Sequence, residues 1–199
     1  MKNLVIGAVS LLALTIANAC GWNTEQKTGF LIPALSVMAQ GDITVDIADS
    51  KCQQYAGKHD EIPPGEYLAW LSTSSESAAD RIFSQAANDG VPIKNVAGDV
   101  IAANKRQLLD GNIGNLFLDY DGTSPDTQEE SYVWTGTKTD GTLGTSNCED
   151  WTSAKEIFGV AGVAIWHTNT WTDFNQLYCY ESFGLYCISA DTYTPRDTL

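Results

Sequence analysis

The chain has 199 residues, of which 43% are hydrophobic and 18% charged, so it fits one globular domain with a substantial core. Its 25 acidic and 11 basic side chains give a net charge of −14, which argues against binding to nucleic acid, anionic lipid head groups or sulfated glycans. Only two histidines are present, His59 and His167, so enzyme classes that depend on histidine are disfavoured.

The N-terminus has the pattern of an export signal. A lysine near Met1 is followed by the apolar run Leu4–Ile16 and by the small residues Ala17–Ala19. The run is too short to span a membrane. An ordinary signal peptidase and a lipoprotein peptidase would both cut before Cys20, because the residues preceding it are similar to a bacterial lipobox. The predicted organisation is a signal peptide over residues 1–19, a lipidated tether over 20–29 and one domain over 30–195.

The cysteine count bears on the fate of Cys20. An odd number of thiols in an exported protein requires an explanation, and this chain has five cysteines. If Cys20 carries lipid, the other four can form two disulfides in an oxidising compartment, in any of three pairings. The alternative is a free or intermolecular Cys20. We expect a lipoprotein of the outer membrane or cell surface, and otherwise a periplasmic or secreted protein.

Hydrophobic periodicity predicts two helices and several short strands in chain order. The helices are Asp46–Gly57, which stops at its glycine, and Glu76–Ala87, which stops before Asn88–Gly90. A short helical turn is expected at Lys105–Leu109. The predicted strands are Phe30–Val37, Tyr67–Leu71, Ile93–Val96, Val100–Ala102, Leu116–Leu118, Tyr132–Thr135 and Gly184–Ser189.

The C-terminal third contains a segment without clear periodicity. Ser153–Asn175 is predicted to be a long loop, which the flanking Cys148 and Cys179 can pin. Two early helices followed by short strands indicate an α+β fold with a small, mainly antiparallel sheet and long loops.

Several segments together carry a family resemblance over roughly residues 30–190. Five of these segments contain one of the last four cysteines or lie between two of them. In chain order they are Ala48–Cys52, Gly65–Ser72, Val133–Gly136, Asn147–Trp151 and Leu185–Ile188. In order and spacing the chain resembles the endostatin-like branch of the C-type-lectin-like fold. It is particularly similar to bacterial domains of unknown function grouped with that branch, including spirochaete endostatin-like surface lipoproteins.

The resemblance implies the disulfides Cys52–Cys187 and Cys148–Cys179, but it does not extend to the ligands of the family. The N-terminal histidines of the endostatin zinc site, the arginines of its heparin site and the calcium triplets of the sugar-binding lectins have no counterparts here. Trp171–Asp173 is only distantly similar to the lectins' Trp-Asn-Asp motif. We therefore expect no cofactor, no zinc and no heparin-type polyanion as partner.

One acidic loop is a weak calcium candidate. Asp119, Asp121 and Asp126 alternate with other residues near Gly122 and offer the oxygen ligands that a hard cation needs. The spacing does not match the twelve-residue calcium loop. The alternative is an Asp-Gly turn with a solvated acidic rim.

Aromatic residues crowd the C-terminal third of the chain. We expect Trp70, Trp134 and Trp151 to lie in the core, because large rings bury large areas. Trp166 and Trp171 in the predicted loop are either core residues or exposed anchors for a ligand, with Asp173 beside them.

The function expected from these observations is that of a non-catalytic module. No Gly-x-Ser-x-Gly elbow or His-x-x-x-His pair is present, and four cysteines are better used as disulfides. We expect an exported, lipid-anchored surface module of adhesion type that binds an extracellular protein or glycan. The alternatives are a calcium-assisted glycan-binding lectin-like module and a structural protein of the envelope.

Overall fold

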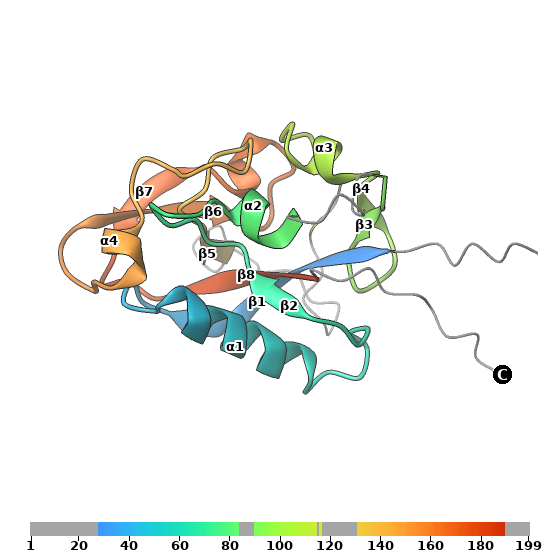
Figure 1. Cartoon of the computed structure of the whole chain (residues 1–199), viewed down its shortest axis with the longest axis horizontal. Coiled ribbons are helices and arrows are strands. Elements are labelled where there is room, and N and C mark those ends of the chain that lie inside the picture. The colour runs from blue at the N-terminus through green and yellow to red at the C-terminus, as the bar shows by residue number, and fades with distance from the viewer. Residues whose placement is uncertain (1–27, 84–89, 115, 117–130, 190–199) are drawn as a thin grey trace, which may run out of the picture.

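A computed structural model describes residues 28–83, 90–114, 116 and 131–189 of the chain. Eight strands form one sheet in the order β4-β3-β1-β8-β5-β6-β7, with β2 paired to β8 as well (Figure 1). Their bounds are β1 Gly29–Ala39, β2 Tyr67–Ala69, β3 Ile93–Lys94, β4 Val100–Ala102, β5 Tyr132–Trp134, β6 Phe158–Val163, β7 Asn175–Tyr178 and β8 Phe183–Ser189. The predicted α+β class is confirmed.

The sheet is mixed, because β1 runs parallel to β3 and β5 runs parallel to β8, whereas the remaining pairs are antiparallel. Its centre is the long antiparallel pair of β1 and β8. The register of this pair shifts between Ala34 and Ala39, so residues 35–38 of β1 form a bulge.

Helices cover the sheet, and the core consists of two clusters. The helices are α1 Val45–Ala56, α2 Ala78–Phe83, α3 Lys105–Leu108 and α4 Cys148–Trp151, with a 3-10 turn at Asn169–Trp171. Helix α1 buries its apolar face in a cluster with Trp134 and Trp151, whereas α2 and α3 contribute to a second cluster with Trp70. All three tryptophans are fully buried, as the sequence predicts.

A largely buried ion pair joins α1, α2 and β2. Arg81 of α2 donates to a carboxylate oxygen of Asp49 in α1 at 2.6 Å and to the carbonyl oxygens of Ala69 and Leu71 at 3.0 and 3.2 Å. The second Asp49 oxygen accepts the Ala69 N–H at 2.8 Å. Because every partner is hydrogen-bonded, the pair fixes the position of α1 relative to α2.

Most predicted elements are close to those in the structure. The first helix and the strand Val100–Ala102 agree, and β1 is longer than predicted. The predicted Glu76–Ala87 helix begins later than expected, at Ala78, because Glu76 and Ser77 are not helical; it is seen as helix to Phe83, and residues 84–89 lie outside the described part of the chain. In the predicted strand Leu116–Leu118, Leu116 belongs to no strand and the other two residues lie outside the described residues.

The predicted long loop Ser153–Asn175 is wrong, because β6 runs through it and β7 begins at its last residue. Two glycines in β6 weaken the strand pattern of its sequence. A Cβ on Gly159 would lie 2.6 Å from the Cys148 sulfur, and one on Gly162 would lie 1.9 Å from the Trp171 carbonyl oxygen. Close packing therefore requires glycine at these strand positions, although glycine weakens a strand pattern.

The two ends of the described domain lie together. Leu31 near the start of β1 pairs with Ile188 near the end of β8. Figure 1 shows these strand ends on one side of the molecule and α4 with the β6–β7 end on the other. None of the helices among the described residues is both long and apolar enough to cross a membrane.

Candidate functional site

Both disulfides of the structure have the pairing that the family resemblance implies. Cys52–Cys187 joins α1 to β8 with a Cα–Cα distance of 5.3 Å. Cys148–Cys179 joins α4 to the residue after β7 with a Cα–Cα distance of 5.7 Å. The predicted pairing is confirmed, and the second bridge fastens the end of the domain that lies farthest from β1's start.

The α4 turn beside this bridge has an unusual backbone. Its four residues, Cys148, Glu149, Asp150 and Trp151, have φ between 55° and 60°, which is the left-handed region. For a residue with a side chain this conformation costs about 1–2 kcal/mol. Such a turn persists only where surrounding contacts hold it.

Side-chain contacts hold the left-handed turn. The Trp151 indole N–H donates to the Ser72 carbonyl oxygen at 2.9 Å, and the Asn147 side chain accepts the Asp150 N–H at 3.1 Å. Ser74 donates its N–H and its hydroxyl to the Asp150 carboxylate, which lowers the pKa of Asp150. This contribution to stability is complete above the ordinary Asp pKa of about 4 and is lost as the pH falls through the lowered value.

Replacing Glu149 by glycine should stabilise the domain by about 1 kcal/mol, because glycine enters the left-handed region without steric cost. Glu149 is exposed, and the hydrogen bond from Thr152 goes to its backbone oxygen, so the substitution removes little else. Urea unfolding measures the change. Glu149→Ala is the control, since alanine keeps the steric cost; a glycine variant no more stable than this control would contradict the account.

Three rings form an exposed stack at the same end of the molecule, and we call Phe158, Tyr178 and Tyr180 the aromatic ladder. The ring centroids of Phe158 and Tyr178 are 4.7 Å apart, and those of Tyr178 and Tyr180 are 5.2 Å apart. The outer rings keep 43% and 45% of their surface exposed. Phe158 lies opposite Tyr178 in the β6–β7 pair, and Tyr180 lies just past Cys179.

The rim of the aromatic ladder is acidic and rigid. Partial desolvation of the ring raises the pKa of Tyr180, and the neighbouring Glu181, Tyr178 and Glu156 act in the same direction. The Gln40 side-chain amide donates to the Tyr180 carbonyl oxygen at 2.6 Å. The turn that carries Tyr180 is therefore tied to the end of β1 as well as to the disulfide.

Trp171 is not an exposed anchor, which corrects one of the two outcomes considered for it. Its side chain is fully buried between Trp70 and Tyr186, with ring centroids 5.5 and 5.4 Å away. The indole nitrogen is buried and bonds to no atom of the described residues. Trp171 belongs to the core because the 3-10 turn that carries it lies against β6.

The other two candidate ligand residues of this region are half-buried. Trp166 packs edge-on against Phe174, with ring centroids 5.0 Å apart. Desolvation raises the pKa of Asp173; the charge of Lys138 opposes this shift and that of Asp140 adds to it. Their roles in binding stay predictions.

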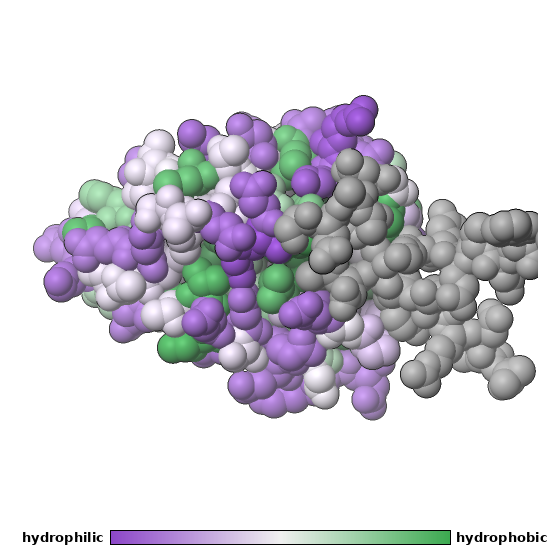
Figure 2. Space-filling view, in the orientation of Figure 1, coloured by the Kyte–Doolittle hydropathy of each residue, from purple (hydrophilic) through white to green (hydrophobic). Residues whose placement is uncertain are grey.

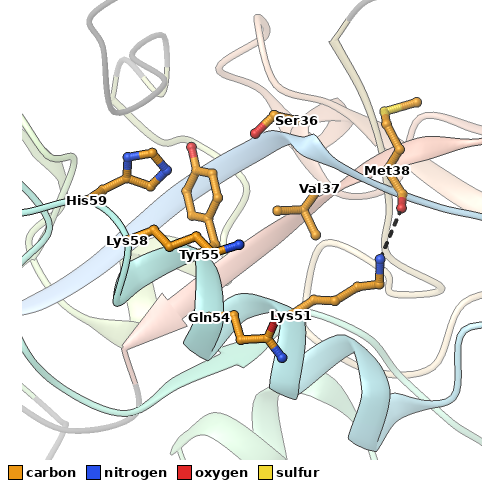
Figure 3. Close-up of a pocket in the computed structure, with 8 residues that line it drawn as sticks. All are labelled: Ser36, Val37, Met38, Lys51, Gln54, Tyr55, Lys58 and His59. Atoms are coloured by element: carbon orange, nitrogen blue, oxygen red, sulfur yellow. Dashed lines mark hydrogen bonds between the residues drawn. The ribbon is translucent and has the colours of Figure 1, made fainter.

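The structure contains a second feature of interest, a hollow between α1 and the β1 bulge (Figure 3). Its volume is about 400 Å³. Lys51, Tyr55, Lys58 and His59 enter it from α1 and the residues that follow the helix, and β1 supplies the opposite wall. Figure 2 shows a mainly hydrophilic surface with scattered apolar patches on the face in view.

No protein-family model matches the chain, and no curated protein matches it. We therefore infer function from the residues and their geometry.

Among the described residues, no three His, Cys, Asp or Glu side chains gather in a way that could hold a metal ion. His59 packs against the Tyr55 ring at 4.7 Å, and His167 Nδ1 lies 3.3 Å from the Gly114 carbonyl oxygen. The calcium candidates Asp119, Asp121 and Asp126 lie outside the described residues, as does Cys20.

Tyr178 and Tyr180 belong to the aromatic-rich C-terminal third that the sequence analysis considers for ligand binding, but the sequence does not join them to Phe158. Strand alternation does not explain why these two rings stack, because β7 ends at Tyr178 and Tyr180 lies in the turn that follows. Phe158 carried no sequence signal, since its strand was not recognised.

Proposed function

We propose that the protein is an exported surface module that captures an extracellular macromolecule without catalysing a reaction. The observation that carries the proposal is the aromatic ladder, in which the two outer rings are exposed on a rigid end of the domain. Aromatic rings supply much of the binding energy at protein interfaces, and exposed apolar patches often mark interaction sites.

The location of the aromatic ladder supports capture. It lies opposite the end at which β1 begins and β8 finishes (Figure 1). A lipid on Cys20 would hold the domain by the β1 end, so the aromatic ladder would face away from the membrane. The disulfide and the left-handed turn keep this end rigid, which reduces the entropy cost of binding.

We further propose that the fold is of the C-type-lectin-like, endostatin-like type. The α+β class, the two disulfides with first-to-last and second-to-third pairing, and the neighbouring ends of β1 and β8 support this assignment. Superposition of an experimental structure on endostatin tests it.

The aromatic ladder variant Phe158→Ser, Tyr178→Ser, Tyr180→Ser should lose most of the binding that the wild-type domain shows on immobilised matrix proteins or a glycan array. We expect a loss of at least about tenfold, the equivalent of about 1.4 kcal/mol, since truncating an interface anchor commonly costs more than 1 kcal/mol. The measurement is the apparent Kd for the matrix protein or glycan that binds the wild-type domain.

The matched control is the variant Ile47→Ser, Val100→Ser. These two side chains are 51% and 53% exposed and apolar, but they lie on α1 and β4. The control should bind as the wild type does. Equal binding by the aromatic ladder variant, or an equal loss in the control, would contradict the proposal.

Cys20 should be the first residue of the mature protein and should carry acyl chains. One acyl chain binds a membrane only marginally, so we expect the several chains of a bacterial lipoprotein. Mass spectrometry of the protein from its native membrane checks this. A mature protein with an unmodified Cys20 thiol would refute the anchor while leaving the binding proposal intact.

A further inference from the structure

The hollow between α1 and the β1 bulge is unusual in its charge. Among the described residues that line it are two lysines and a histidine but no aspartate or glutamate, in a chain with 25 acidic and 11 basic side chains. Lys58 and His59 lie just after the end of α1, and Lys51 lies within the helix (Figure 3). The hollow is therefore a local positive site on an acidic protein, which favours an anionic group.

The geometry of the hollow is set by the β1 bulge. Because the β1–β8 register is interrupted between Ala34 and Ala39, Ser36 and Met38 are exposed. Lys51 Nζ donates to the Met38 carbonyl oxygen at 3.5 Å, which holds the lysine across from the bulge. Such bulges are common next to binding sites because they redirect side chains.

The lining also contains neutral polar and apolar groups. Ser36 and Gln54 are exposed and offer a hydroxyl and an amide, while Val37 and Met38 offer apolar surface. Figure 3 shows the Tyr55 ring between His59 and Val37, and its side chain is 4% exposed. A ligand that fits this lining carries one anionic group, several hydroxyls and an apolar face.

We propose that this hollow binds the acidic sugar unit of a glycan, with Lys58 facing the carboxylate and Lys51 adding positive charge from the opposite side of the hollow. A uronic acid ring has the required carboxylate, hydroxyls and C–H face. A volume of about 400 Å³ is at the lower end of the range of about 300–1,000 Å³ for small-ligand sites, which suits one such unit. The net charge of −14 opposes a long polyanion, so the site takes a single acidic group.

This site is separate from the aromatic ladder, so either proposal can fail alone. The probe is methyl β-glucuronide, titrated into the mature domain and followed by the amide resonances of the bulge and of the end of α1. We expect saturable shifts at Ser36, Met38 and Lys58. The neutral methyl β-glucoside should give shifts less than a third as large at the same concentration.

The variant Lys58→Gln should weaken glucuronide binding at least threefold, whereas the control Lys155→Gln should leave it unchanged. Both lysines are exposed, and both substitutions remove one positive charge. Equal binding of glucuronide and glucoside, or equal effects of the two substitutions, would overturn the proposal. Equal binding of sulfate would indicate an anion site without sugar recognition, and equal binding of N-acetylglutamate an acidic-peptide site; either result would overturn it.

Discussion

Replacing both Cys52 and Cys187 by alanine should lower the free energy of unfolding by about 5 kcal/mol. The bridge spans 135 residues, and the chain-entropy estimate for a loop of this length gives about that value. Both residues are fully buried, so alanine also removes core contacts made by the two sulfur atoms. Urea unfolding of the double variant measures the change.

The second bridge provides the matched comparison. Cys148–Cys179 spans 31 residues, and its removal should cost about 4 kcal/mol by the same estimate. The Cys52–Cys187 variant should therefore be the less stable of the two by about 1 kcal/mol. A Cys52–Cys187 variant as stable as the wild type under oxidising conditions would show that this bridge does not constrain the unfolded chain.

Trp171→Ala should destabilise the domain by about 3–5 kcal/mol, the usual cost of removing a buried tryptophan side chain. The ring fills the space between Trp70 and Tyr186 in the second core cluster, and the Tyr186 hydroxyl donates to the Trp171 carbonyl oxygen at 2.8 Å. Thermal or urea unfolding measures the loss. Ligand affinity per folded molecule should be unchanged.

Trp171→Phe separates the loss of ring volume from the loss of the indole nitrogen. Because the Trp171 N–H is buried and bonds to no atom of the described residues, its removal also removes an unsatisfied donor. Phenylalanine should therefore cost much less stability than alanine. A large loss of ligand affinity in either variant, with the free energy of unfolding unchanged, would show that Trp171 belongs to the binding surface.

Elements with strong local signals were predictable from the sequence. The helix that ends at Gly57 and the strand Val100–Ala102 have clear periodicity and clear stops, and the structure contains both. Strand β6 was not predictable in this way. Its glycines at positions 159 and 162 are required by the sulfur of Cys148 and the backbone of Trp171, and these contacts are far from local.

The candidate site depends still more on tertiary contacts. Residues 169–175 are rich in Asn, Thr and Asp, which predicts an exposed loop, yet Trp171 is drawn into the core by Trp70 and Tyr186. The left-handed α4 turn contains no glycine, so no local rule predicts it. Its conformation follows from the disulfide, the burial of Trp151 and the hydrogen bonds to Asp150.

Site-specific photo-crosslinking tests most directly whether the aromatic ladder contacts the partner. p-Benzoylphenylalanine would replace Phe158 in one variant and Val100 in another, two positions with 43% and 53% exposure. Each variant would be irradiated with the ligand that the matrix or glycan panel retains. We expect a crosslinked complex from position 158 and none from position 100. Crosslinks from position 100 alone would place the binding surface elsewhere and contradict the central claim.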